Sequence, residues 1–179
     1  ILLENEIDID DKEFYKLYDE HKMKSKSGKN NNNDLFTFDV DLNDFVGYEQ
    51  VNSLTKIYHI EKYKDNYIIF PEKNPFYFEA GGQISDQGII SFQDTSTEVI
   101  DVYQAANGAT GLIVNNGNFT IDQEIELEVN KSFRSGVSKS HTAAHIVHTA
   151  LRSILGDHVS QAGSNVAPGK FRFDFSHTE

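Results

Sequence analysis

The sequence contains no cysteine and no tryptophan, and only one methionine and three prolines in 179 residues. Without cysteine there is no disulfide framework and no thiolate to bind a metal ion. No apolar run approaches the roughly 18 residues of a membrane-spanning helix, and no signal-peptide pattern is present. We therefore expect a soluble, cytoplasmic protein without a membrane partner.

Positive charge is also scarce, because 16 Lys and Arg face 28 Asp and Glu for a net charge of -12. This balance argues against nucleic acid, since Lys and Arg carry phosphate binding. Residues 131–179 nevertheless hold more basic than acidic side chains, so a local basic face stays open beside a merely solvated surface. A hydrophobic fraction of 38% is enough for a core, in one ordinary domain or two small ones. The chain begins at Ile1, so we expect a piece of a longer protein.

Three segments differ in their patterns. Residues 1–34 read as a polar helical leader that ends in an asparagine-rich linker. Residues 35–130 hold short β-rich runs separated by turn residues such as those at 115–118, and residues 131–179 combine a helix with strands. Roughly seven strands about ten residues apart predict an antiparallel barrel or sandwich. The predicted runs are Lys56–Ile60, Tyr67–Phe70, Ile89–Phe92, Val99–Tyr103, Leu112–Val114 and Glu124–Val129.

A helix rich in histidine follows the strands. We expect it to begin at a cap formed by Ser138 or Ser140 and to end at Gly156. His141, His145 and His148 then share one face, and the first two are spaced to bind one metal ion. The alternative is a structural pair, because short matches arise easily. A zinc protease needs Glu directly after the first histidine, where this chain has Thr142.

Two further stretches flank this helix. Gly81-Gly82-Gln83 predicts either a hairpin bend or a close backbone approach at the paired glycines. Residues 157–165 read as a polar loop, and Lys170–Phe175 alternates as a strand whose phenylalanine face packs on the helix.

Three segments in this order resemble the editing region of alanyl-tRNA synthetases, and the resemblance covers about residues 40–179. They are Phe45-Val46-Gly47-Tyr48, Pro75-Phe76-Tyr77 leading to Gly81-Gly82-Gln83, and His141-Thr142-Ala143-Ala144-His145 continuing to Phe171-Arg172-Phe173-Asp174-Phe175-Ser176-His177. Residues 1–28 resemble the helix that joins the tRNA-recognition region of these enzymes to their editing domain.

The resemblance implies an α+β fold: a short N-terminal helix (1–34), an antiparallel β-barrel subdomain (35–130) and the start of an α/β editing subdomain (131–179). It implies hydrolysis of the ester that links serine or glycine to tRNA(Ala). His141 and His145 would bind zinc together with a downstream Cys-x3-His pair. Because that pair is missing here, we expect an incomplete zinc site and an inactive fragment. ATP and Mg belong to the aminoacylation part of these enzymes, outside this chain.

The resemblance also leads us to expect catalytic roles for Thr142, Gln83 and Ser85. The Thr142 hydroxyl is suited to contact the polar side chain of the amino acid, while Gln83 and Ser85 face the same pocket. His148 is expected to pack or to support the first two histidines. Three alternatives stay open: a free-standing aminoacyl-tRNA deacylase, a tRNA-binding module without chemistry, and a zinc hydrolase for another small ester. The exposed edge near Phe171–Phe175 predicts self-association.

Overall fold

The computed structural model describes residues 38–115 and 118–177. The predicted leader at 1–34 and the centre of the predicted turn at 115–118 lie outside the described residues. Within the described part of the chain, no helix is long and apolar enough to cross a membrane. The described elements are antiparallel strands, one short parallel pair and a single helix, in line with the α+β prediction.

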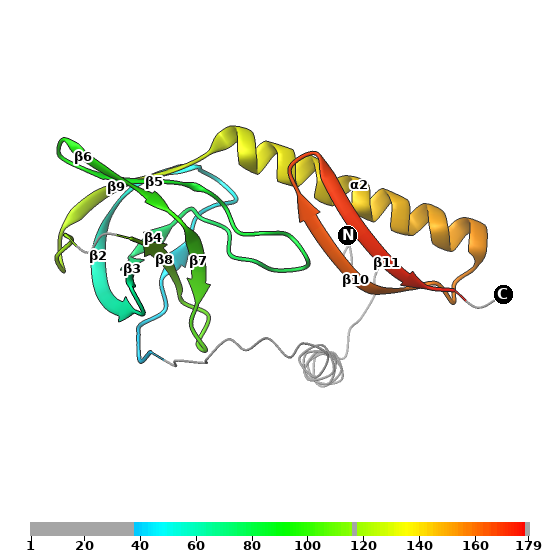
Figure 1. The fold of residues 1–179 in the computed structure, drawn as a ribbon, viewed down its shortest axis with the longest axis horizontal. Coiled ribbons are helices and arrows are strands. Elements are labelled where there is room, and N and C mark those ends of the chain that lie inside the picture. The colour runs from blue at the N-terminus through cyan, green and yellow to red at the C-terminus, as the bar shows by residue number, and fades with distance from the viewer. Residues whose placement is uncertain (1–37, 116–117, 178–179) are drawn as a thin grey trace, which may run out of the picture. The chain divides into compact units, whose positions relative to one another are not determined.

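Seven antiparallel strands form the main sheet in the order β6-β5-β9-β2-β3-β8-β7 (Figure 1). Their bounds are β2 (Asn52–Tyr63), β3 (Asn66–Pro71), β5 (Gly88–Phe92), β6 (Thr95–Val99), β7 (Asp101–Gln104), β8 (Thr110–Val114) and β9 (Glu124–Val129). A two-residue parallel pair, β1 (Asp44–Phe45) with β4 (Lys73–Asn74), accompanies them. All six runs predicted from residue patterns lie in or across these strands.

Alternation of side chains explains the burial of the sheet. In β9, the glutamates are exposed while Ile125, Leu127 and Val129 are buried, as a period of two requires. Strand β8 is buried along its whole length, because Leu112 and Ile113 enter core clusters on opposite faces of the strand. The sheet is therefore packed on both sides at β8.

The hydrogen bonds do not close this sheet into a ring, so the predicted barrel is not realised in the pairing of the described strands. Strands β6 and β7 remain at the two edges. They are consecutive in the chain, and the run predicted as one strand at 99–103 is interrupted at Ile100, whose amide donates to Ile113 O at 2.9 Å. One core cluster nevertheless draws residues from all seven strands, including Val99 and Val102. The chain thus changes strand partner at Ile100 while the sheet curves around a shared core.

Helix α2 (Lys131–Leu155) is longer at its start than predicted. Its N-cap is Asn130, whose Oδ1 accepts from Phe133 N at 3.0 Å. The predicted cap at Ser138 or Ser140 is wrong, because Asn130 satisfies the free amides a full two turns earlier. The predicted end is confirmed: Gly156 has φ of 114° and donates its amide to Arg152 O at 2.9 Å.

Strands β10 (Ser160–Ala167) and β11 (Lys170–Ser176) form an antiparallel ribbon beside α2 (Figure 1). The strand predicted at Lys170–Phe175 is confirmed. The loop predicted at 157–165 is confirmed at 157–159 and wrong from Ser160 onward, because backbone pairing with β11 makes a strand of residues whose side chains are polar or small. Phe171 packs on the buried centre of this region, whereas Phe175 is 39% exposed. That buried centre consists of Val137, Ala144 and Val166.

Candidate functional site

The glycine loop makes a tight turn before β5. Gly81 and Gly82 have φ of 60° and 81°, where L-residues with side chains are disfavoured. Ala80 and Gln83 exchange two backbone hydrogen bonds of 3.2 and 2.9 Å. A Cβ at Gly82 would collide with Ser164. The close backbone approach expected at the two glycines is therefore present, and the neighbour is another segment of this chain.

The loop pairs with the edge of β10. Ile84 donates its amide to Val166 O at 3.2 Å, and Val166 donates to Gly82 O at 2.7 Å. These bonds form a parallel bridge centred on Gln83 and Val166. The loop is thereby attached to the ribbon that packs on α2.

The side chains of Gln83 and His141 meet at this junction. Gln83 is 6% exposed, and its Oε1 lies 2.8 Å from His141 Nδ1. An amide oxygen only accepts hydrogen bonds, so Nδ1 of His141 carries the proton and donates. Burial, and secondly the neighbouring His145, lower the pKa of His141, which favours the neutral ring. In that ring, Nε2 holds a lone pair free for another partner.

His145 lies one turn further along α2 with its ring stacked on His141. The ring centroids are 4.9 Å apart and the planes differ by 14°. The two imidazoles are neighbours as predicted, and imidazole nitrogen is a ligand that zinc prefers. Zinc needs about four donors, and no group of three or more potential ligands exists among the described residues. The residues present therefore fit half of a zinc site.

His148 does not join this pair. Its ring lies 5.0 Å from the ring of Phe173 on β11, and its Nε2 is buried without a hydrogen-bond partner. The contact agrees with the packing role expected for it.

Thr142 and Ser85, the other two residues predicted to be catalytic, make separate contacts. Thr142 is exposed on α2 and donates its hydroxyl to Ser138 O at 3.0 Å. Ser85 donates to Asp101 Oδ1 on β7 at 2.5 Å. Of the predicted site residues, the structure thus brings together Gln83, His141 and His145.

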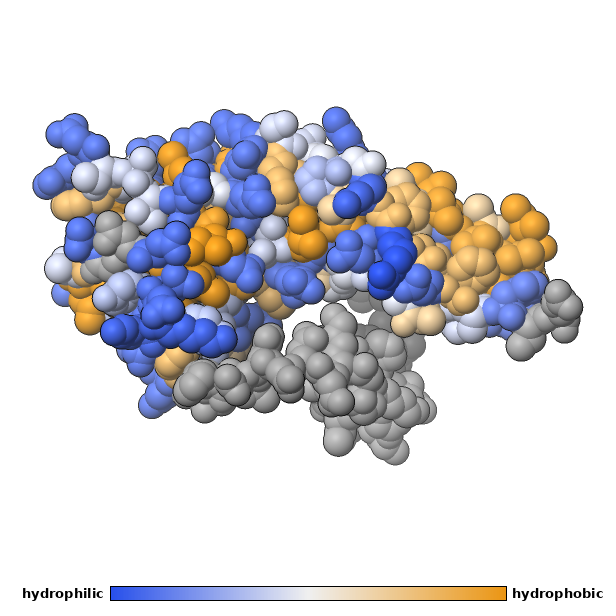
Figure 2. Space-filling model, in the orientation of Figure 1, coloured by the Kyte–Doolittle hydropathy of each residue, from blue (hydrophilic) through white to orange (hydrophobic). Residues whose placement is uncertain are grey.

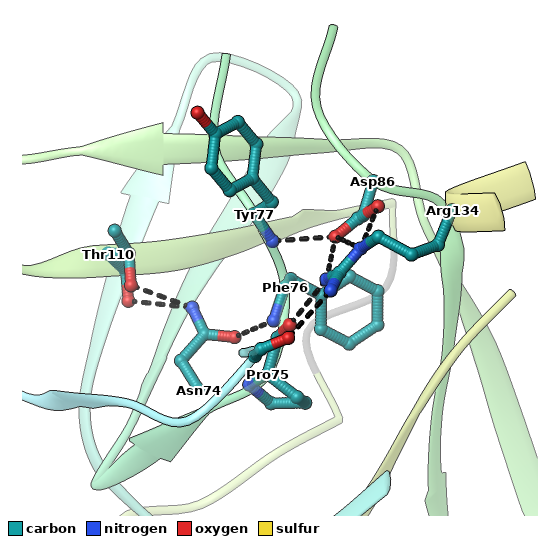
Figure 3. Close-up of polar contacts among 8 residues, drawn as sticks. Asn74, Pro75, Phe76, Tyr77, Asp86, Thr110 and Arg134 are labelled. Carbon is teal, nitrogen blue, oxygen red and sulfur yellow. Dashed lines mark hydrogen bonds and ion pairs between the residues drawn. The ribbon is translucent and has the colours of Figure 1, made fainter. Parts of the chain in front are cut away.

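A buried ion pair that the sequence analysis missed lies next to this site. Asp86 is 1% exposed, and Arg134 Nε donates to both of its carboxylate oxygens at 2.8 Å. The guanidinium also donates to Gly47 O at 2.7 Å and to Pro75 O at 2.8 Å. Figure 3 shows Asp86 accepting in addition from the amide of Tyr77, at 2.7 Å. One arginine on α2 therefore binds three segments of the sheet region.

The segments around this arginine are those that carry the family resemblance. Gly47 and Pro75 each present a backbone carbonyl, and Asn74 fixes the second segment by accepting from Phe76 N at 3.0 Å and donating to Thr110 Oγ1 at 2.8 Å (Figure 3). The only sequence signal for this ion pair is the position of Arg134 two turns before His141. An arginine exposed on the surface of the helix could have the same position, so the signal does not distinguish the two.

A cavity of about 720 Å³ opens near the start of α2. Glu98, Glu128 and Lys131 are among its lining residues. It includes none of the predicted site residues, so we place the candidate site at the Gln83–His141 junction, where the polar groups converge.

Comparisons with known proteins show what the chain as a whole is similar to. The family model of the class II (A) tRNA synthetases matches residues 1–133. An alanine–tRNA ligase of Oceanobacillus iheyensis is 41% identical over 144 residues, covering 74% of this chain and 16% of the relative. Alanine–tRNA ligases of Petrotoga mobilis and Caldicellulosiruptor saccharolyticus are 34% and 32% identical over the whole chain, which covers 23% and 22% of their lengths. The chain thus spans about a fifth of the length of these curated relatives.

Proposed function

The chain belongs to the family of class II (A) tRNA synthetases, and from this premise we propose that it is the editing portion of an alanine–tRNA ligase. Its reaction is hydrolysis of the ester that links serine or glycine to tRNA(Ala), in the cytoplasm. The observation that carries the proposal is the contact of Gln83 with His141. It joins the two most distinctive segments of the editing-region resemblance at one polar junction.

In this hydrolysis, a water oxygen bonds to the ester carbonyl carbon and the bond to the tRNA ribose breaks. The water proton passes to the ribose oxygen, which frees the tRNA. We assign to Thr142 the recognition of serine: its hydroxyl stands exposed on the same helix as His141 and can pair with a hydroxyl on the substrate. Such a pocket rejects alanine, because a methyl group leaves the polar partner unpaired.

Gln83 acts in this scheme through His141. Its oxygen is occupied by the imidazole, so it orients the ring and selects the proton position. Ser85 is assigned a supporting role in the loop, because its hydroxyl is bound to Asp101.

We assign His141 and His145 as two ligands of a zinc ion. When bound, zinc would supply a positive centre that orients the aminoacyl end. The family's Cys-x3-His pair would supply the remaining ligands, and this sequence contains no cysteine. We therefore expect the 179-residue chain alone to lack deacylase activity. ATP and Mg would serve aminoacylation, in the part of the enzyme that this chain does not include.

A second function, a tRNA-binding module without chemistry, is favoured by one observation. At the junction, His141 and His145 are two neighbouring imidazoles, and no group of three or more potential metal ligands exists among the described residues. The two functions differ in a direct way, because a binding module retains tRNA(Ala) without ever clearing a mischarged form.

The test uses the full-length enzyme that contains this chain. His141→Ala is expected to retain aminoacylation with alanine and to accumulate Ser-tRNA(Ala), as measured by acid-gel analysis of charged tRNA. The matched control is His158→Ala, at an exposed histidine outside the junction. Normal clearance of Ser-tRNA(Ala) by the His141 variant would rule out the proposed site.

A further inference from the structure

We propose that Arg134 and Asp86 are a positioning pair that holds the Gly81–Asp86 loop in one register against the histidine face of α2. This inference rests on the proposed function, because it assigns the pair a role in aligning Gln83 with His141. Neither residue touches the substrate in this scheme.

The loop and the helix run in opposite directions and are joined at two points. Gln83 contacts His141, and Asp86, three residues later, contacts Arg134, seven residues earlier. Seven helical residues rise about 10 Å, and three extended residues span about 10 Å. The two lengths match, so both contacts form without distorting either segment.

Two separated contacts fix more than one contact does. The Gln83–His141 bond alone would let the loop pivot or slide along α2. The ion pair at the other end acts together with the backbone bonds to Val166 to prevent both movements, and thereby sets the angle at which the amide oxygen meets Nδ1. Contacts that support a functional side chain in this way hold it within about 0.5 Å of its productive position.

The rest of the loop is fixed residue by residue. Gly82 and Ile84 are hydrogen-bonded to Val166 through their backbones, and Ser85 binds Asp101. Every residue from Gly82 to Asp86 therefore takes part in a bond to another segment or, for Gln83, to α2. Arg134 binds the last residue of this hydrogen-bonded segment.

The pair requires arginine chemistry. The guanidinium reaches the carboxylate with a planar fork and still donates to Gly47 O and Pro75 O. A lysine keeps the charge but presents a single nitrogen, so it cannot hold Asp86 and both carbonyls in the same geometry. The conservative substitution is thus expected to loosen the register without leaving the carboxylate uncompensated.

The test compares four variants of the full-length enzyme: Arg134→Lys, Gln83→Ala, the double variant and Arg152→Lys. Arg152 on the same helix is the matched control, since its ion pair is with Asp157, just beyond the end of the helix, and both side chains are exposed. With Ser-tRNA(Ala) as substrate, Arg134→Lys is expected to lower kcat about a hundredfold, the effect of a displacement near 1 Å. KM and alanine charging are expected to stay within about twofold, because substrate contacts are intact.

The double variant separates positioning from general structure. If Arg134 acts through Gln83, adding Arg134→Lys to Gln83→Ala lowers kcat by no more than about twofold further, because the two effects are coupled. The inference would be overturned if the kcat loss of the double variant equalled the product of the two single losses. An unchanged kcat in Arg134→Lys would also overturn it. Should Arg134→Lys fail to fold, Arg134→Met with Asp86→Asn removes both charges and serves in its place.

Hydrogen exchange keeps this inference apart from the proposed function. In Arg134→Lys, the amides of Ile84 and Val166 are expected to exchange at least about tenfold faster than in wild type and in Arg152→Lys. If the exchange rates of these amides do not change, the positioning role of Arg134 and Asp86 is refuted even if deacylation is confirmed. If the wild-type enzyme never clears Ser-tRNA(Ala), the proposed function is refuted. Hydrogen exchange still decides in that case whether the ion pair holds the loop.

Discussion

The seven-stranded sheet and the α2–β10–β11 region are built on cores of different size. The sheet buries a cluster drawn from all its strands, and a second cluster around Phe70 lies on its other face. The helix and ribbon have only Val137, Ala144 and Val166 as their buried centre. Figure 2 shows hydrophobic surface gathered over the part of the chain that holds α2 and the ribbon, where Ile146, Ile154 and Phe175 are exposed.

Because of this difference in core size, the sheet serves as the scaffold and the α2–β10–β11 region carries the candidate site. The sheet has the apolar area to hold its shape, and the polar junction lies where the core is thin. A thin core leaves room for imidazole and amide groups but positions them poorly. Arg134 and Asp86 supply the missing order through a buried ion pair, at the point where the two regions join.

The largest effect is expected in the core of the sheet. Leu127→Ala should lower the free energy of unfolding by about 3 to 4 kcal/mol, because Leu127 is fully buried at the centre of β9. Urea denaturation measures the change. Leu54→Ala is the matched control, since Leu54 is 66% exposed on β2, and we expect it to cost less than about 0.5 kcal/mol. Equal losses would contradict the assignment of the core.

The corresponding truncation in the core of the α2–β10–β11 region should cost less stability than Leu127→Ala. Val137→Ala removes two methyl groups from the small cluster on α2, and we expect a loss of about 1.5 kcal/mol. Hydrogen exchange should show the loss in α2 and the ribbon, with the central strands of the sheet unaffected. A loss spread evenly over both regions would show that the two cores unfold as one unit.

The pH dependence of stability tests the histidine junction. Burial and the neighbouring His145 lower the pKa of His141 below 6.5, so the unfolded chain binds a proton first as pH falls. The contribution of His141 is therefore fully present above pH 6.5 and is lost as pH falls from there through the lowered pKa. His141→Gln should flatten the slope of unfolding free energy against pH in this window, while Thr142→Ala should retain it. An unchanged slope in His141→Gln would refute the assignment.

The smallest effect on stability is expected at the exposed apolar surface. Phe175→Ser should change the free energy of unfolding by less than about 0.5 kcal/mol, because the ring is already 39% exposed. The same variant should reduce the self-association predicted for this edge, as measured by light scattering. A wild-type chain that stays monomeric at high concentration would remove that prediction.

Strand patterns were predictable because alternation along a strand is local. The runs at Tyr67–Phe70 and Glu124–Val129 lie within β3 and β9. Strand β10 was not predictable in this way, since Gln161, Gly163 and Asn165 have no apolar alternation and take their conformation from pairing with β11. The start of α2 was misplaced for a related reason: two serines, Ser138 and Ser140, suggested caps, and only the backbone shows that Asn130 provides the cap.

The candidate site divides in the same manner. The spacing of His141 and His145 requires them to be neighbours on any helix, so the sequence alone determined that their side chains lie together. It also determined that Gly81 and Gly82 form an unusual turn, because glycine is the residue that tolerates positive φ. Only the tertiary structure decided that Gln83 contacts His141 and that Arg134 joins Asp86. Those contacts connect residues 58 and 48 positions apart. Local patterns do not encode such distances, because the packing of the glycine loop against α2 sets them.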